Sequence, residues 1–352
     1  MNELKELALV FLKLGTLAFG GPAAHIAMME KEFVEKRQWL SQDDFLTMMG
    51  FTNLIPGPNS TEMALHIGYL RAKGKGMLVA GLCFILPAML MVLVLSWVLV
   101  TYGSIPAVSS ALNGVGPVML GLILSVIVKF AKPLLKTPFD WALTIGMFGL
   151  ALVVNELAVL LMAGVLAFLG KKAKLYVIEP ISLLTLFLIF LKIGSILYGS
   201  GYVLLAFIKT EFMDVRQVLT LTEILDALTI GQLTPGPVFT TATAIGYLIH
   251  GVPGGIVATI GIFLPAFLLV YFLHPVFKKL SQMASVKHFL DGLKLASLAL
   301  MVKVALDVGI SLSTSWFFVL TPITFVILWK TKTNPTWLIF GGIGVGILSI
   351  FL

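Results

Sequence analysis

The sequence predicts an all-α polytopic membrane protein built from two repeats with inverted topology. Three observations carry this prediction: an apolar composition, an internal duplication over nearly the whole chain, and a Pro-Gly-Pro tripeptide in each half. We expect about ten transmembrane spans and two re-entrant helical hairpins, each with Pro-Gly-Pro at its tip. The N-terminal repeat would cover residues 1–175, and the C-terminal repeat would cover residues 180–352.

Composition places the chain in a lipid bilayer. Of its 352 residues, 59% are hydrophobic and 12% are charged, whereas soluble domains carry about 25% charged residues. Apolar runs such as 77–100 and 255–273 are long enough to cross a bilayer. The net charge of +7 comes from Lys and Arg in short loops, which is typical of cytoplasmic loops and not of nucleic-acid binding. We therefore expect a multi-pass protein of the cytoplasmic (inner) membrane.

The sequence indicates no catalytic, metal or cofactor site. Cys83 is the single cysteine, which excludes intrachain disulfides and Cys-rich metal sites. The chain contains no H-E-x-x-H, G-x-S-x-G or Walker A sequence. We therefore expect that the protein is not an enzyme and that it is not driven by ATP.

The duplication has an offset of 179 residues, the difference between positions 235 and 56. At this offset "FLKLGTLAFG" (11–20) matches "FLKIGSILYG" (190–199). After a slip of one residue, the Leu-Pro-Ala at 86–88 matches that at 264–266, and the Gly-Tyr at 68–69 matches that at 246–247. Repeats of this kind are common in transporters.

Loop charges indicate that the halves are inverted. In the first half the loop before the third apolar segment is basic, with Arg71, Lys73 and Lys75, and the loop after it is uncharged. The second half shows the reverse order. Because basic loops mark the cytoplasmic face, the halves should cross in opposite directions. Each half has six apolar segments, so inversion requires that one of them, the Pro-Gly-Pro segment, enters and leaves on the same side.

The lengths of the hairpin arms fit this reading. As helices, residues 45–55 and 59–70 would span about 16 and 18 Å, or half of the bilayer. Both incoming arms begin with capping-box patterns, which are typical of helices that start at an interface. These patterns are Ser41-x-x-Asp44 and Thr220-x-x-Glu223.

Each Pro-Gly-Pro should start a helix near the bilayer centre. Pro56 and Pro58 stop the incoming helix, and the outgoing helix then begins at Asn59, Ser60 or Thr61. In the second half the matching helix start lies at 238–241. A helix N-terminus presents free N–H groups and partial positive charge, which suit a compact oxyanion. The alternative is that each Pro-Gly-Pro only kinks a packed helix.

Four ionisable residues inside apolar segments are further candidates, because a charge at membrane depth is costly. Lys13 and Lys192 occupy matched positions and would attract or neutralise the anion; alternatively they snorkel to an interface. Glu62 and His66 lie four residues apart and would carry a coupling proton. Alternatively, Glu62 caps its helix and His66 is a bonded interior histidine.

A glycine-rich break interrupts the first apolar segment. Gly20, Gly21 and Pro22 precede His25 in "FGGPAAH". The break would form a second backbone concavity near the anion; helix packing through small residues is the alternative.

These stretches resemble the chromate ion transporter family in its two-domain (long-chain) form. "FGGPAAHIAMMEKEFVEKRQWL" and "PGPNSTEMALHIGY" match the family's first domain, and the second "PGP" and "IGY" resemble its second domain. The resemblance covers essentially the full chain. It implies an inner-membrane carrier of chromate, a divalent tetrahedral oxyanion. Such carriers usually export the ion, use a proton gradient and confer chromate resistance.

The resemblance also implies where the anion binds. In the first half the motif residues are Gly20, Gly21, Pro22, His25, Pro56, Gly57, Pro58, Asn59, Ser60, Thr61, Gly68 and Tyr69. In the second half we add Pro235, Gly236, Pro237, Thr240 and Thr241. The second half departs from the pattern, because Val238 and Phe239 replace Asn59 and Ser60. We therefore expect the first hairpin to supply more ligands.

Two other functions stay open at this stage. Sulfate, which shares the charge and shape of chromate, would be taken up by a carrier of the same design. A membrane scaffold that transports nothing is the alternative from another class, although it would have no need for two broken helices. The sequence also leaves a homodimer open.

Overall fold

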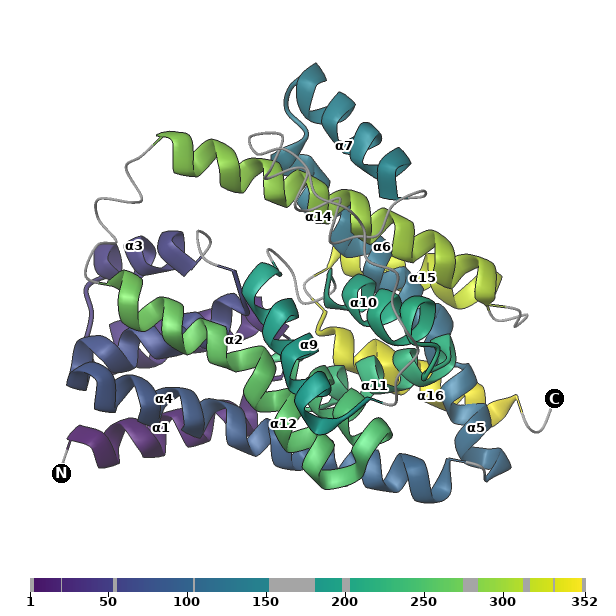
Figure 1. The fold of residues 1–352 in the computed structure, drawn as a ribbon, viewed down its shortest axis with the longest axis horizontal. Coiled ribbons are helices and arrows are strands. Elements are labelled where there is room, and N and C mark those ends of the chain that lie inside the picture. Colours follow the sequence, from purple (N-terminus) through teal and green to yellow (C-terminus); the bar gives the residue numbers. More distant parts are fainter. Residues whose placement is uncertain are drawn as a thin grey trace. The chain divides into compact units, whose positions relative to one another are not determined.

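The computed structural model is helical throughout the residues that it describes: 3–19, 21–52, 56–103, 105–151, 181–197, 203–274, 284–312, 317–331 and 333–349. The chain forms two compact units, and each unit draws segments from both halves of the sequence (Figure 1). Unit 1 comprises Met1–Thr101, Ile181–Gly201 and Ile230–Met283. Unit 2 comprises Tyr102–Pro180, Tyr202–Thr229 and Ala284–Leu352.

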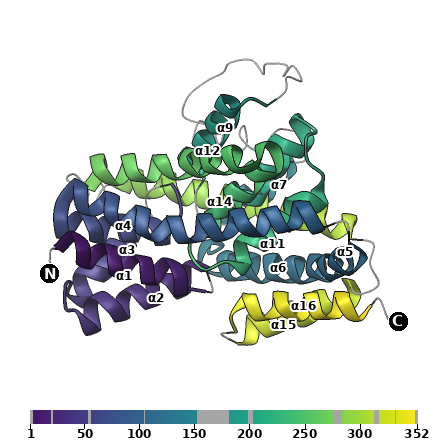
Figure 2. The same cartoon turned by 90° about the horizontal axis from the view of Figure 1, so that it is seen from below.

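Unit 1 holds both Pro-Gly-Pro tripeptides. Its helices are α1 (Glu3–Leu17), α2 (Gly21–Glu30), α3 (Gln42–Thr52), nearly all of α4 (Asn59–Tyr102), α9 (Leu183–Ile196) and α12 (Thr241–Leu273), with the short turns η1 (Lys31–Lys36) and η3 (Val238–Thr240). Helix α1 lies along α4, as Figures 1 and 2 both show. A Cβ on Gly15 would lie 2.6 Å from the Phe84 carbonyl oxygen, so the absence of a side chain permits this close packing. Helix α9 packs on α12 in the same way through Gly194.

Unit 2 is a second helical bundle. Its elements are α5 (Pro106–Asn113), α6 (Val115–Leu134), α7 (Pro138–Ala151), α10 (Val203–Ile208), η2 (Lys209–Val215), most of α11 (Leu221–Leu233), α14 (Ala284–Ser311), α15 (Phe317–Lys330) and α16 (Pro335–Leu348). Helix α14 packs against α6, α7 and α10, while α15 and α16 pack against α6. Lys209 forms ion pairs with Asp214 and Asp307, at 2.9 and 3.2 Å, within this bundle.

Three helical stretches in the described part of the chain are long and apolar enough to cross a membrane. They are Asn59–Tyr102, Ser110–Leu134 and Val238–Leu273. Shorter apolar helices are Leu183–Ile196, Val319–Lys330 and Pro335–Leu348. Large apolar side chains remain exposed along these helices, including Leu90 and Val94 of α4 and Phe272 of α12. Surfaces of this kind are stable in contact with lipid.

Helices α4 and α12 each consist of two helices joined at a sharp break. In α4 the backbone leaves the helical region at Ala72 and Lys73. In α12 it leaves that region at His250 and Gly251. Each long helix therefore has a short first part, which begins after Pro-Gly-Pro, and a longer second part. The first part of α4 ends close to the predicted limit at residue 70.

Matched positions of the two halves share unusual backbone conformations. A positive φ is uncommon for residues other than glycine. The pairs are Gln38 (52°) with Gln217 (51°), Lys73 (50°) with Gly251 (59°), and Gly57 (133°) with Gly236 (95°). The π-helical turns η1 and η2 also occupy corresponding stretches. The similarity of the halves therefore extends from side-chain identity to local geometry.

Both predicted capping boxes are confirmed. The Asp44 N–H donates to Ser41 Oγ over 3.1 Å at the start of α3. At the start of α11 the Glu223 N–H donates to Thr220 Oγ1, and the Thr220 N–H donates to Glu223 Oε2 over 2.7 Å. These bonds satisfy N–H groups that have no partner inside the helix.

Candidate functional site

The first Pro-Gly-Pro separates two helices, as the sequence predicts. Helix α3 ends at Thr52 and α4 begins at Asn59. Gly57 has a φ of +133°, a conformation that glycine adopts most easily. A Cβ at this position would also collide with Oε1 of Glu62, whose carboxyl group therefore lies directly over the glycine. Glycine is thus required here both for its conformation and for the space that it leaves.

The second Pro-Gly-Pro has the same construction. Helix α11 ends at Leu233, and the chain resumes as η3 and then α12 from Thr241. Gly236 has a φ of +95°. A Cβ here would lie 2.7 Å from the Cβ of Ala88 in α4. The helix start predicted at 238–241 is confirmed.

The two tripeptides are anchored reciprocally within unit 1. The Gly57 N–H donates to the Leu197 carbonyl, just after α9, over 2.9 Å. The Gly236 N–H donates to the Ala18 carbonyl, just after α1, over 3.2 Å. Ala18 and Leu197 are themselves 179 positions apart. Each tripeptide is therefore held by the end of the first helix of the other half.

His25 links this anchor to the N-terminus of α4. Its side chain is 1% exposed. Nε2 lies 2.8 Å from the Ala18 carbonyl oxygen and Nδ1 lies 3.2 Å from Ser60 Oγ. Because a carbonyl oxygen only accepts, the neutral ring carries its proton on Nε2, and Ser60 then donates to Nδ1. His25 thus connects the residue that holds Gly236 to the second residue of α4.

The first turn of α4 presents polar groups without partners. Thr61 and Glu62 are fully buried. The Thr61 hydroxyl and both Glu62 carboxyl oxygens form no hydrogen bond with the described residues. The alternative in which Glu62 caps its own helix is therefore wrong. A buried polar group without a partner costs about 1–3 kcal/mol, so these atoms indicate a place for water, a proton or a ligand.

The start of α12 differs in this respect. Thr240 and Thr241 are also fully buried. The Thr240 hydroxyl donates to the Pro237 carbonyl and the Thr241 hydroxyl to the Val238 carbonyl, each over 2.8 Å. Both hydroxyl donors are thus used locally. The second site contributes the helix N-terminus and no ionisable side chain.

The remaining candidates lie at different distances from these helix starts. Lys13 is on the exposed face of α1, where its charge acts on Glu32. Lys192 is half-buried on α9. Pro22 lies in the first turn of α2, as is common for proline. Gly21 begins that helix, and Gly20 lies outside the described residues.

His66 has a partner that the sequence reasoning missed. Its Nδ1 lies 2.8 Å from Nδ1 of His274, the residue that follows α12. His274 in turn packs on Tyr69, with ring centroids 4.4 Å apart. His66 and His274 are 208 positions apart and no motif joins them, so only the packing of α12 on α4 brings them together.

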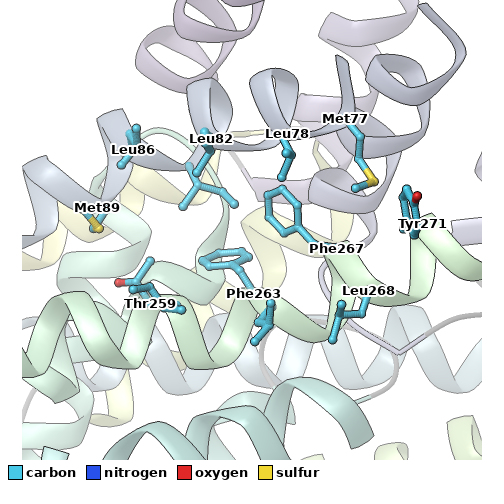
Figure 3. Close-up of a pocket in the computed structure, with 13 residues that line it drawn as sticks. Met77, Leu78, Leu82, Leu86, Met89, Thr259, Phe263, Phe267, Leu268 and Tyr271 are labelled. Atoms are coloured by element: carbon cyan, nitrogen blue, oxygen red, sulfur yellow. The ribbon is translucent and has the colours of Figure 1, made fainter. Parts of the chain in front are cut away.

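A groove of about 360 Å³ between α4 and α12 is a different feature of unit 1. Figure 3 shows Phe263 and Phe267 of α12 projecting toward the leucines of α4. The hydroxyl of Thr259, one of the polar groups in its lining, donates to the Gly255 carbonyl over 2.7 Å. Since the groove is lined by no charged side chain, it has no means of holding an anion.

The features suited to an anion are therefore the two helix starts. The N-terminus of α4 carries about half a positive charge, and that of α12 adds a similar amount. The described residues contain no group of three or more His, Cys, Asp or Glu side chains that would hold a metal ion. The arrangement favours a small anion over a cation.

Comparisons with known proteins agree with this chemistry. The chain matches the chromate transporter family over residues 5–169 and 184–347. It is 30% identical over 320 residues to a chromate transport protein of Cupriavidus metallidurans, which covers 84% of this chain and 80% of the relative. It is 28% identical over 369 residues to a chromate transport protein of Pseudomonas aeruginosa, which covers 92% and 87%. An uncharacterized transporter of Methanocaldococcus jannaschii is 25% identical over 357 residues, covering 91% and 88%.

No solved structure shows a significant match to this chain. The family match, however, spans both halves of the sequence and nearly the whole length of the protein. The chain therefore belongs to the chromate transporter family, a family of membrane transporters and not of enzymes.

Proposed function

We propose that this protein is a secondary transporter that expels chromate across the cytoplasmic membrane, uses the proton-motive force and confers chromate resistance. The observation that carries the proposal is the first turn of α4. There a helix N-terminus, the unpaired Thr61 hydroxyl and the unpaired Glu62 carboxyl are buried together beside Gly57. A transporter needs such a polar site away from water, because it must bind its anion where the membrane excludes solvent.

In this proposal the anion binds mainly at the first tripeptide. Pro56, Gly57 and Pro58 expose the start of α4, and Asn59, Ser60 and Thr61 supply polar groups. The residues 235–237 with Thr240 and Thr241 contribute the second positive helix end. His25 orients Ser60, because its ring bonds the Ser60 hydroxyl. Lys13 and Lys192 act at longer range by attracting the anion, since Lys13 lies on an exposed helix face.

We further propose the topology of two inverted repeats, with about ten spans and two re-entrant hairpins. The matched backbone conformations and the reciprocal anchors of Gly57 and Gly236 support a two-fold relation. Exchange of partners between equivalent sites is typical of such a relation. The breaks at Ala72–Lys73 and His250–Gly251 support a short returning arm followed by a separate span.

The topology is tested by labelling single cysteines. In a Cys83→Ala background, Lys73→Cys and Lys279→Cys should both react with a membrane-impermeant maleimide from the cytoplasmic side. Each loop is basic in the sequence, and basic loops stay in the cytoplasm. Reaction of the two cysteines from opposite faces would contradict the inverted arrangement.

The function is tested by flux in proteoliposomes. Purified protein should move chromate when a membrane potential and a pH gradient are imposed. Replacing Pro56, Gly57 and Pro58 with alanine should reduce this flux by about 100-fold or more, because it closes the start of α4 into a continuous helix. Gly50→Ala is the matched control, since Gly50 lies in α3 with open space around its Cα.

Competition then identifies the substrate. Unlabelled sulfate should reduce chromate flux less than the same concentration of unlabelled chromate. Stronger inhibition by sulfate, with uptake of labelled sulfate, would favour the sulfate carrier. Absence of flux for both anions in correctly folded protein would contradict transport and favour the scaffold.

A further inference from the structure

The histidine pair of unit 1 is built for proton transfer. The two Nδ1 atoms of His66 and His274 are 2.8 Å apart. Two imidazole nitrogens at this distance share one hydrogen, because one must donate and the other must accept. A proton that arrives at Nε2 of one ring can therefore leave from Nε2 of the other ring, after the shared hydrogen crosses between the Nδ1 atoms. Both rings then reset by exchanging tautomers.

The pair joins a buried location to a half-buried one. His66 is 1% exposed, whereas His274 lies at the end of α12 and is half-buried. Tyr69 and Tyr271 pack around His274, with their own ring centroids 6.3 Å apart. Lys73 lies over the Tyr69 ring at 5.6 Å. Burial lowers the pKa of His274, and the Lys73 ammonium group lowers that pKa further, so the ring passes a proton on and does not retain it at neutral pH.

At its inner end the pair approaches Glu62. Glu62 and His66 are one turn apart on α4, and helical side chains lean toward the N-terminus of their helix. His66 therefore lies over the turn that holds Glu62, and Glu62 lies over Gly57. Both Glu62 oxygens lack a partner among the described residues, so one water molecule between carboxyl and imidazole would complete the chain.

The titratable groups occur in one half only. At the offset of 178 residues that applies after the slip, Glu62 corresponds to Thr240, His66 to Ala244 and His274 to Ser96. None of these three equivalents titrates near neutral pH. The matched scaffold thus carries proton-accepting side chains on one side of the break and none at the equivalent positions.

We propose that Glu62, His66 and His274 form a proton route between the anion site and the Lys73 end of unit 1, and that the transported dianion binds together with a proton on Glu62. This inference rests on the proposed function. An ionised carboxylate beside the start of α4 repels a dianion, whereas the protonated acid can donate a hydrogen bond to it. The His66–His274 pair supplies this proton from the basic face, which loop charge assigns to the cytoplasm.

Co-binding of one proton remains compatible with efflux. A divalent anion with one proton carries one net negative charge. A potential that is negative inside drives this charge outward by about 2.3 kcal/mol per 100 mV. The proposal therefore predicts that each exported dianion removes a proton from the cytoplasmic side.

The test separates net transport from exchange. Net chromate efflux requires that Glu62 be loaded and unloaded in each cycle, whereas exchange of labelled for unlabelled chromate leaves the proton in place. In proteoliposomes that report internal pH with a trapped dye, His274→Gln should slow net flux and the accompanying pH change by about tenfold or more. The same variant should change exchange less than about twofold, because the anion site is intact.

Controls distinguish this route from a structural role. His250→Gln removes another histidine of α12, one that bonds the Ile181 carbonyl, and it should leave both fluxes near wild type. Glu62→Gln should make anion affinity independent of pH, while wild-type affinity rises as pH falls. In His274→Ala, added imidazole should restore net flux, since the side chain that it replaces is half-buried.

Three results would overturn the route: equal loss of net flux and exchange in His274→Gln, no effect of that variant, or pH-dependent affinity in Glu62→Gln. Each of them can occur while wild-type protein transports chromate normally. Absence of chromate flux in wild-type protein would instead contradict the proposed function.

Discussion

The two Pro-Gly-Pro segments share their scaffold and differ in their chemistry. Each contains a glycine with positive φ, each glycine N–H is bound by the end of the other half's first helix, and each stands against a matched alanine, Ala266 or Ala88. After the first tripeptide, however, Thr61 and Glu62 keep unpaired buried polar atoms. After the second, Thr240 and Thr241 use their hydroxyls on the local backbone. A duplicated framework can thus hold both helix ends in place while one copy carries the ionisable groups.

The largest expected effect tests whether the two scaffolds are equivalent. Gly57→Ala and Gly236→Ala should each reduce chromate flux by about 100-fold, because both force a Cβ into an occupied space at a positive φ and displace a helix start. Flux in proteoliposomes is the measurement, with Gly50→Ala as the control. If Gly236→Ala transports normally, the second segment is not part of the site.

An intermediate effect is expected at His25, which has no counterpart because the matched position is Leu204. His25→Ala removes the bonds to Ala18 and Ser60 and leaves a cavity. We expect a loss of about 2–4 kcal/mol in the free energy of unfolding and about tenfold in flux. Thermal unfolding in detergent and flux assays measure these values. A variant with wild-type stability and flux would show that this link between the two segments is dispensable.

The smallest effect compares two threonines. Thr61→Val removes an unpaired hydroxyl that is available to the anion, so affinity for chromate should fall about fivefold to tenfold. Thr241→Val removes a hydroxyl that bonds the Val238 carbonyl, so stability should fall by about 1 kcal/mol while affinity stays unchanged. Equilibrium binding and thermal unfolding separate these outcomes. Equal losses of affinity would show that both segments ligate the anion through hydroxyls.

Much of the local structure was predictable from short-range physics. Proline cannot donate to a helix, so Pro56 and Pro58 predict the gap before α4. Ser41 and Thr220 predict the starts of the incoming arms, because their hydroxyls accept from the first free N–H groups. The relation between Gly57 and Gly236 could also be read from their spacing. The spans expected over ten crossings, the repeat boundaries and the anion ligands remain predictions.

Other features depended on contacts that leave no mark in a sequence pattern. The Ala18 and Leu197 carbonyls are backbone groups, which any residue type supplies, so nothing in their identity reveals that they hold Gly236 and Gly57. His274 is a single histidine at a helix end, and nothing within its own stretch of sequence predicts a partner in α4. The repeated Leu-Pro-Ala was visible as a match, but its reason, the close approach of a Pro-Gly-Pro, was not.

By itself the sequence determined that this protein lies in a membrane, repeats its framework and interrupts helices at two matched points, because composition, spacing and proline act locally. Only the tertiary structure decided which half carries unsatisfied polar atoms and that His66 meets His274. Those properties depend on which groups packing brings within about 3 Å of one another, a distance that chain order does not encode.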